Sequence, residues 1–437
     1  YTQLSLIFPL SNASSNHAII DTLTGGLGQL AETIPWIAGQ ISREALDGAR
    51  SGSFRIVPLG RAPSLTIRDL RHDESAPAMD GLRRAKFPFR MLDEALIAPQ
   101  RTLPGGIAGS GPNPTPVFAV QANFISGGLI LTFVTQHQAM DLAGQRQIMS
   151  LLSRVCRGDT LGDSEFVDAN PTRRGRIPFL DDHDLDTPCP NLCFQVLKPA
   201  ANRPTIDQAP APASWAYFSF PPESLAAIKL LAMGNVKLPQ GFVSTDDALT
   251  AFIWQSVGRV RLQRLGPDAK STLGRAVDVR RHLGIPQTYP GLVQNMAYQT
   301  YPLEELVHLP VGTVASELRR AVEPSTSNLA YATRALATMI DRADDKSTVS
   351  LTAGIDPSAD FMVSSWTNPS FYTMDFGLGL GNPEAVRRPC FVSVEGLGYF
   401  MPRPVGGEIV VAVCLRDQDM SRLQENRDFS RYTMYIG

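Results

Sequence analysis

A histidine and an aspartate four residues apart are the first candidates for chemistry in this sequence. His137 and Asp141 belong to the stretch His-Gln-Ala-Met-Asp, which follows an apolar run from Leu129 to Val134. The run predicts a buried strand, so the imidazole lies where that strand ends. A neutral imidazole can take the proton of a hydroxyl, because its pKa lies near neutrality. We therefore predict that His137 is a general base, with a hydrogen-bonded core histidine as the alternative.

The residues after Asp141 have the spacing of an amphipathic helix. Apolar side chains recur at intervals of three and four, at Ile148, Leu151, Leu152 and Val155. This pattern predicts a helix over residues 142–155 with one buried face. Asp141 then stands at the start of the helix, where a carboxylate suits the free backbone amides and the helix dipole.

The rest of the chain mixes helix and strand patterns without a regular alternation. Helices are predicted over residues 18–31, 222–233 and 245–259, and strands over 215–220, 273–278, 361–366, 391–398 and 408–415. Residues 188–214 are rich in proline and predict a crossover linker. The pattern therefore predicts an α/β or α+β protein, with an N-terminal lobe over 1–187 and a C-terminal lobe over 215–437.

Composition limits the classes of partner. A chain of 437 residues with 43% hydrophobic and 19% charged residues is long enough for two globular domains of about 200 residues each. The net charge of −2 and the lack of a polybasic stretch argue against nucleic acid or a membrane as partner. We expect a monomer that binds small molecules. No apolar run reaches the roughly 18 residues of a membrane span, and the start at Tyr1 lacks a signal-like core, so we expect a cytoplasmic location.

A second set of motifs lies far downstream of the histidine. Asp375-Phe376-Gly377-Leu378-Gly379 follows Ser364-Ser365-Trp366 in the same part of the chain. With the H-x-x-x-D stretch, these motifs resemble the BAHD family of acyl-CoA-dependent acyltransferases, which carry D-F-G-W-G near the C-terminus. Leu378 stands where the plant consensus has tryptophan. Three further stretches fit the family in the same order: 35–39, 244–254, and 277–280 with 289–291.

Within that family the sequence is most similar to fungal enzymes that acetylate trichothecenes. The similarity lies in residues 375–381 running into 383–389, in 291–296, and in 415–417. It implies two similarly folded chloramphenicol-acetyltransferase-like lobes, each a mixed sheet with helices, with a channel at their interface that passes His137. It also implies acetyl-CoA as co-substrate, no metal, and a small-molecule alcohol as acceptor. The first acceptor to test is the C-3 hydroxyl of a trichothecene.

The resemblance also implies roles for residues around His137. Asp141 is expected to turn away from the channel and to pair with an arginine, with Arg280 as the first candidate and Arg275 as the second. The hydroxyl of Ser364 and the indole N–H of Trp366 are candidate donors to the oxyanion of the tetrahedral intermediate. Trp366 as a plain core aromatic is the alternative.

The glycine-rich stretch and the basic residues near it complete the candidate site. The resemblance implies that Asp375, Gly377 and Gly379 belong to a structural loop that shapes the channel. A phosphate-binding loop is disfavoured, because no Lys-Ser/Thr follows the glycines. Coenzyme A carries phosphates, which helix N-termini and basic side chains bind. The candidates for this contact are Ser244, Thr245, Arg387 and Arg388.

Three other functions fit the sequence less well. A condensation domain carries H-H-x-x-x-D-G, but Gln136 and Leu142 occupy the places of its first histidine and last glycine. A serine hydrolase requires a G-x-S-x-G elbow, which the sequence lacks. A binding protein that keeps the fold without catalysis is disfavoured because His137 and Asp141 are both present.

Overall fold

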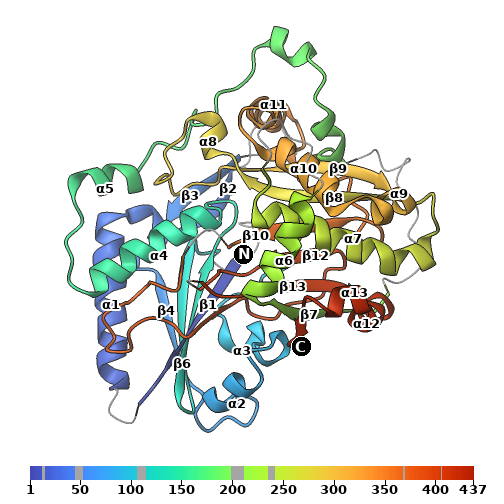
Figure 1. Cartoon of the computed structure of the whole chain (residues 1–437). Coiled ribbons are helices and arrows are strands. Elements are labelled where there is room, and N and C mark those ends of the chain that lie inside the picture. The colour runs from blue at the N-terminus through green and yellow to red at the C-terminus, as the bar shows by residue number, and fades with distance from the viewer. Residues whose placement is uncertain are drawn as a thin grey trace.

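The computed structural model describes residues 1–11, 15–44, 53–105, 115–197, 211–234, 242–367, 370–404 and 406–437. Within these ranges the chain forms two α/β halves, each built on one mixed sheet. Figure 1 shows the first half on the left in blue to cyan and most of the second half on the right in yellow to red. The expected class, two mixed α/β lobes, is confirmed. Residues 198–210 of the expected linker 188–214 lie outside the described ranges.

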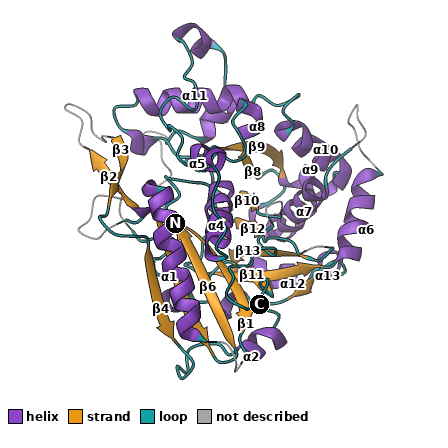
Figure 2. Ribbon diagram, turned by 90° about the vertical axis from the view of Figure 1, so that its left-hand side faces the viewer, coloured by secondary structure: helices purple, strands orange, loops and turns teal. Residues whose placement is uncertain are grey.

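The sheet of the first half has five strands in the order β11-β1-β6-β5-β4. Their bounds are Thr2–Pro9 for β1, Ser64–Asp69 for β4, Phe118–Ile125 for β5, Gly128–Thr135 for β6 and Ala385–Arg387 for β11. β6 is buried along its whole length, as its apolar run requires. The long helices α1 (Asn16–Thr33) and α4 (Leu142–Cys156) pack on this sheet, as Figure 2 shows. Strand β11 comes from the second half of the sequence and pairs with β1.

Shorter elements surround this sheet. They are the hairpin β2 (Gly39–Glu44) and β3 (Ser53–Pro58), the helices α2 (Met79–Arg84), α3 (Glu94–Ile97) and α5 (Asp163–Ala169), and the 3-10 helices η1 (Pro35–Ala38), η2 (Phe89–Met91), η3 (Asp182–Asp186) and η4 (Pro190–Phe194).

The sheet of the second half has seven strands in the order β14-β7-β13-β12-β10-β8-β9. Their bounds are Ala213–Phe220 for β7, Lys270–Asp278 for β8, Gln294–Pro302 for β9, Phe361–Ser365 for β10, Leu397–Phe400 for β12, Ile409–Arg416 for β13 and Met434–Tyr435 for β14. Strand β10 runs parallel to both β8 and β12. The carboxyl ends of these three strands therefore meet at one edge of the sheet.

Helices complete the second half, and α7 is its longest. The helices are α6 (Pro222–Met233), α7 (Thr245–Leu265), α8 (Arg280–Leu283), α9 (Leu303–His308), α10 (Val311–Val322), α11 (Leu329–Arg342), α12 (Asp417–Glu425), α13 (Arg427–Ser430) and the 3-10 helix η6 (Lys346–Thr348). None of the helices in the described ranges is long and apolar enough to span a membrane.

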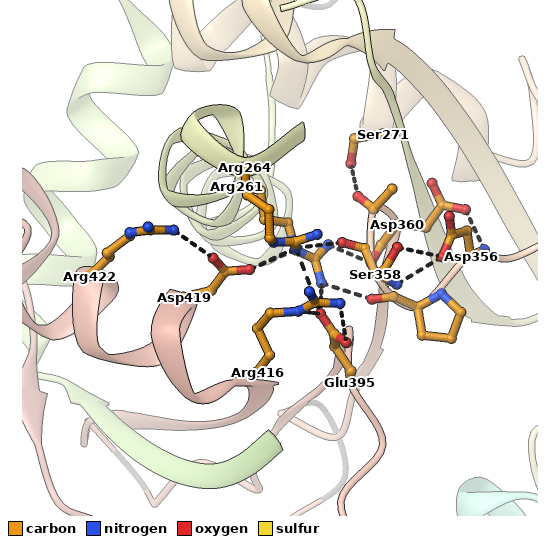
Figure 3. Close-up of polar contacts among 12 residues, drawn as sticks. Arg261, Arg264, Ser271, Asp356, Ser358, Asp360, Glu395, Arg416, Asp419 and Arg422 are labelled. Carbon is orange, nitrogen blue, oxygen red and sulfur yellow. Dashed lines mark hydrogen bonds and ion pairs between the residues drawn. The ribbon is translucent and has the colours of Figure 1, made fainter. Parts of the chain in front are cut away.

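A buried ion network holds the second half together on the side of α7 that faces α12. Arg261 and Arg264 on α7 approach Asp419 and Glu395, which Arg416 and Arg422 also contact. Figure 3 shows these side chains converging beside the 356–360 loop. Arg261 donates to the carbonyls of Pro357 and Asp360 at 2.9 and 2.7 Å. The network therefore fixes the loop that leads directly into β10.

Candidate active site

His137 lies at the end of the first sheet where several strand termini meet. In the register of the sheet, Thr135 at the end of β6 pairs with Thr2 of β1 and with Phe118 of β5. Ser64, the first residue of β4, pairs with Ala119. His137 follows β6 by two residues, so the predicted strand end carries the histidine as expected.

The surroundings of His137 fit an internal space that solvent reaches. Its side chain is accessible, whereas Gln136, Ala139 and Met140 beside it are buried. At the same time, burial within the protein is the main cause that lowers the pKa of His137 below its usual value. Both observations hold for a side chain that lines a channel. The lowered pKa keeps the imidazole neutral at neutral pH, which is the form that a general base requires.

Other groups shift the pKa of His137 less than burial does. A backbone hydrogen bond and the carboxylate of Asp141 raise the pKa, whereas the amino group of Tyr1 and the Arg388 guanidinium lower it.

The carboxylate of Asp141 turns away from His137 and pairs with Arg280 of the second half. Arg280 donates from Nη1 to Oδ2 at 2.8 Å and from Nη2 to Oδ1 at 2.9 Å. Oδ1 also accepts the N–H of Gly144 at 2.9 Å, which caps α4, and Oδ2 accepts the N–H of Val293 at 2.8 Å. All four hydrogen bonds of the carboxylate are thus directed away from a relay with the histidine. The ion pair expected between Asp141 and Arg280 is present.

Arg280 also fixes the segment 289–291 against the start of α4. Its Nε and Nη2 donate to the carbonyl of Tyr289 at 3.1 and 3.0 Å, and Nη2 donates to that of Gly291 at 2.7 Å. A Cβ on Gly144 would lie 2.0 Å from the carbonyl oxygen of Pro290. Only glycine permits this close approach of the helix to the segment.

Arg275, the second candidate for Asp141, has other partners. It donates to Asp246 and Asp247 at the start of α7, each at 2.7 Å. Ser365 on β10 donates to the same Asp246 carboxylate. These contacts join β8, β10 and the start of α7 beside the candidate site.

Ser364 and Trp366 do not act as two parallel donors, which corrects the expectation from the sequence. The indole N–H of Trp366 donates to Ser364 Oγ at 3.0 Å, so it is not free to bind an oxyanion. Because Ser364 Oγ accepts this bond, its own hydroxyl proton is free to point elsewhere. The pair therefore offers one donor to an oxyanion, the Ser364 hydroxyl, which the hydrogen bond from Trp366 orients.

A cavity of about 650 Å³ lies between the two halves and includes several of the predicted residues. Asp141, Ser244, Ser364 and Trp366 line it, and His137 does not belong to its lining. Four arginines from both halves also line it: Arg146, Arg275, Arg281 and Arg319. Asp141 on its wall ends the turn that carries His137. Three further carboxylates, Asp246, Asp278 and Glu323, also line the cavity, so its four arginines face four acidic side chains.

Three of these arginines, Arg146, Arg281 and Arg319, were missed in the sequence. No carboxylate lies within ion-pair distance of Arg146 or Arg281 in the described part of the chain, whereas Arg275 and Arg319 have carboxylate partners. Arg146 lies on α4, five residues after Asp141, and Arg281 directly follows Arg280. Their closeness in the sequence to Asp141 and Arg280 could have marked Arg146 and Arg281 as site residues. In the sequence alone, however, each resembles an ordinary exposed charge.

The glycine-rich loop lies away from the cavity. Gly377 and Gly379 have φ of 68° and 72°, and the N–H of Gly377 donates to Asp375 Oδ1 at 2.9 Å. Arg157 at the end of α4 donates to the carbonyl of Asp375 at 2.6 Å, and Phe376 stacks on Phe133 of β6. None of these loop residues lines the cavity. The loop thus joins the second half to the first sheet, and does not form the cavity wall.

Three of the four residues expected near coenzyme A are placed elsewhere. Arg387 and Arg388 are only 4% and 2% exposed, and their guanidinium groups lie over aromatic rings. Because neither reaches the cavity, the expectation that they bind phosphate is not supported. Ser244 lines the cavity and caps α7 in a capping box with Asp247, while Thr245 is not among the lining residues.

Comparison with known proteins identifies the family. The model of the "Transferase family" matches residues 100–430, and that of the "Trichothecene 3-O-acetyltransferase-like N-terminal domain" matches residues 1–156. The chain belongs to the Transferase family. The resemblance to BAHD acyltransferases noted in the sequence is thereby confirmed.

Named members of the Transferase family match over the full chain. The O-acetyltransferase dmxR13 of Cryptosporiopsis sp. is 45% identical over 100% of this chain and 95% of its own length. The trichothecene 3-O-acetyltransferase TRI101 of Fusarium sporotrichioides is also 45% identical, over 100% of this chain and 94% of its own. The structure of F. graminearum TRI101 complexed with coenzyme A and T-2 mycotoxin has a TM-score of 0.92 at 42% identity, covering 100% of this chain and 96% of that one.

Proposed function

We propose that the protein transfers an acetyl group from acetyl-CoA to a hydroxyl of a fungal secondary metabolite, with the C-3 hydroxyl of a trichothecene as the leading acceptor. The observation that carries this proposal is the similarity to trichothecene 3-O-acetyltransferase TRI101, which is 45% identical over 100% of this chain. The likeness to a family member complexed with coenzyme A and a trichothecene supports the same two substrates.

In the proposed reaction, His137 is the general base in a complex that holds both substrates. Its neutral imidazole removes the acceptor's hydroxyl proton as the oxygen attacks the thioester carbonyl, which forms the C–O bond. The resulting oxyanion accepts a hydrogen bond from the Ser364 hydroxyl. The C–S bond then breaks, and protonated His137 gives the proton to the departing thiolate. No covalent acyl-enzyme is needed.

Asp141 and Arg280 have a structural role in this proposal. Their bidentate pair and its backbone partners fix the start of α4 on the second half. The turn 136–140 that carries His137 ends at Asp141, so the position of the imidazole depends on this contact. Asp375, Gly377 and Gly379 act at a greater distance, by attaching the second half to the end of α4.

The 650 Å³ cavity is the proposed coenzyme A side of the channel. A phosphate requires positive charge that is not already neutralised, and Arg146 and Arg281 have no carboxylate partner within the described ranges. Ser244 at the start of α7 adds a helix N-terminus on the same wall. We expect Arg146→Gln and Arg281→Gln to raise KM for acetyl-CoA by about tenfold each, the scale of one hydrogen bond to a charged group.

The acceptor side is proposed to be a second cavity of about 310 Å³ at the same end of the first sheet as His137. Ser64 and Phe118 line it, and both stand at the strand ends that meet beside the histidine. Residues 106–114, which follow in the chain after its lining residue Gln100, lie outside the described ranges.

The monomeric state and cytoplasmic location expected from the sequence remain predictions.

A different alcohol is the second candidate acceptor. The relative dmxR13 is as similar to this chain as the trichothecene enzyme is, and its name specifies an O-acetyltransferase without a trichothecene. Since the acceptor pocket is the variable part of a shared fold, overall identity does not separate the two acceptors.

The test is the release of free thiol from acetyl-CoA by the purified protein. It is run with a trichothecene that has a free C-3 hydroxyl, with other secondary-metabolite alcohols, and without acceptor. We expect release that depends on the trichothecene and falls by about a hundred- to ten-thousand-fold in His137→Ala. Release with another alcohol only would keep the reaction and replace the acceptor. Binding of acetyl-CoA without release under any condition would favour a non-catalytic binding protein.

A further inference from the structure

Arg388 is a buried cation with no carboxylate within ion-pair distance among the described residues. It follows β11 directly and is 2% exposed. Its Nε has no hydrogen-bond partner among the described residues, and Nη2 donates only a long bond of 3.4 Å to Thr102 Oγ1. An unpaired buried charge costs several kcal/mol of folding free energy. Such a residue calls for an explanation other than stability.

Three aromatic rings surround the guanidinium. Its Cζ lies 5.4 Å from the ring centroid of Trp366, 4.5 Å from that of Phe391 and 4.6 Å from that of Tyr399. Trp366 and Tyr399 also contact each other, at 5.1 Å between centroids. Cation–π contacts offset part of the cost of burial, by up to about 2 kcal/mol for a desolvated contact. They also fix the planes of the rings that the cation touches.

One of these rings orients the candidate oxyanion donor. The Trp366 N–H donates to Ser364 Oγ at 3.0 Å, and the Trp366 backbone N–H donates to the carbonyl of Phe400 at 2.8 Å. The orientation of the indole therefore determines which lone pair of Ser364 Oγ accepts the hydrogen bond. It thereby also determines the direction in which the Ser364 hydroxyl proton points. Arg388 packs on that indole and so acts on Ser364 through Trp366.

Arg388 is also close enough to act on His137. After burial, the charges that shift the pKa of His137 are the amino group of Tyr1 and Arg388, which lower it, and Asp141, which raises it. Glu94 contacts the same Thr102, whose backbone N–H it accepts at 2.7 Å, but among the described residues it forms no ion pair with Arg388. The positive charge of Arg388 therefore stays available to the histidine.

We propose that Arg388 is a positioning residue of the acyl-transfer site: it fixes the Trp366 indole, and through it the Ser364 hydroxyl, and it supplies positive charge beside the reacting atoms. This inference rests on the proposed acetyl transfer. The charge favours an anionic tetrahedral intermediate over a neutral ground state, so its effect belongs in kcat more than in the KM for either substrate.

Arg387 offers a matched control. It is as buried as Arg388, at 4% exposed, and lies over the rings of Phe87 and Tyr217. Its Nε and Nη1 donate to the carbonyls of Phe87 and Val386. It does not contact Trp366. Loss of this neighbouring arginine thus reports the structural cost of removing a buried cation without touching the Ser364 hydroxyl.

The experiment compares Arg388→Met, Arg388→Lys and Arg387→Met with the wild type in the thiol-release assay, per mole of folded protein measured by circular dichroism. We expect Arg388→Met to lower kcat by about 10- to 100-fold, less than the roughly 100- to 1000-fold loss for an oxyanion donor itself. KM for acetyl-CoA should change by less than about threefold. The acid limb of the kcat/KM profile should move to higher pH, because loss of the positive charge raises the pKa of His137 and the base must be neutral.

The other variants separate charge from structure. Arg388→Lys keeps the charge but loses the planar stack. The acid limb of its kcat/KM profile should therefore stay at the wild-type pH, while its kcat should fall less than that of Arg388→Met. This variant also provides the measurement if Arg388→Met does not fold. Arg387→Met should keep the wild-type kcat and acid limb. Equal behaviour of Arg388→Met and Arg387→Met, with only folded yield reduced, would overturn the proposal. A wild type that transfers no acetyl group to any acceptor would instead refute the proposed function, and this inference with it.

Discussion

Two of the buried ion clusters in the described ranges differ in how completely their polar groups are paired. Between the halves, each carboxylate oxygen of Asp141 accepts two hydrogen bonds, and all three nitrogens of Arg280 donate. Within the second half, the network around Arg261 and Asp419 has more members (Figure 3), yet Nε of Arg261 and of Arg264 lacks a hydrogen-bond partner among the described residues.

The difference follows from what each cluster positions. The cluster between the halves centres on the bidentate Asp141–Arg280 pair, with the more exposed Asp278 as a second partner of Arg280. The turn that carries His137 ends on this pair. The network in the second half shares its charge between Glu395 and Asp419, so no single contact defines it. We infer that the first cluster sets the geometry of the site, whereas the second contributes stability that is spread over several contacts.

The largest expected effect is that of Asp141→Ala. It leaves Arg280 buried with only Asp278 as a carboxylate partner, and a broken buried pair costs about 3–5 kcal/mol. We expect a loss of that size in the free energy of unfolding, measured by urea denaturation, and a loss of kcat as the His137 turn moves. In the double variant Asp141→Ala/Arg280→Met, the loss should be smaller than the sum of the single losses. A stable, fully active Asp141→Ala protein would contradict the structural role.

Asp419→Ala should cost less stability and leave the chemistry intact. Asp419 is fully buried and accepts from Arg264 at 2.8 Å, but Glu395 remains to balance the arginines. We expect a loss of about 2–3 kcal/mol, below the full cost of a broken buried pair. At a temperature where the variant is folded, kcat per mole of folded protein should equal that of the wild type. A kcat reduced as strongly as in Asp141→Ala would remove the distinction between the clusters.

The sequence predicted the first cluster well because its signals are local. The apolar run before His137 predicts β6, and the spacing after Asp141 predicts α4 with Ile148, Leu151 and Leu152 buried, as observed. Asp141 caps that helix as expected. The partner Arg280 came from the order of family motifs, since no local pattern joins residues 139 positions apart.

The expectations that were wrong involve residues whose surroundings come from distant parts of the chain. Arg387 and Arg388 were expected to contact the phosphates of coenzyme A, but rings from Trp366, Tyr399 and Tyr217 cover them. The predicted strand 391–398 is largely irregular, and only Leu397–Phe400 forms β12. Phe391 is buried by packing on the rings of Phe89, Trp215 and Tyr399, not by pairing in a sheet, and Val392 is 53% exposed. Pattern alone does not separate these two causes of burial.

Gly144→Ala tests whether close packing, and not charge alone, fixes the contact between the halves. The new Cβ would lie 2.0 Å from the Pro290 carbonyl oxygen, so α4 and the 289–291 segment must separate. We expect a loss of about 1–3 kcal/mol in the free energy of unfolding together with a lower kcat. Gly25→Ala on α1 is the control, because nothing lies within 4 Å of its Cβ. That variant should gain about 0.5–1 kcal/mol from helix propensity, and a similar gain for Gly144→Ala would show that the contact is not tight.

The smallest effect is expected at the edge of the second cluster. Arg422 lies 3.3 Å from Asp419, but its side chain is 35% exposed, so water and salt screen the pair. Arg422→Ala should change the free energy of unfolding by less than about 1 kcal/mol and should not alter kcat. The same measurement in high salt should reduce even this difference, whereas the loss in Asp141→Ala should persist because that pair is buried. If Arg422→Ala instead unfolds the protein as readily as Asp419→Ala does, the network is cooperative, and its stability would depend on every member and not on the buried ones alone.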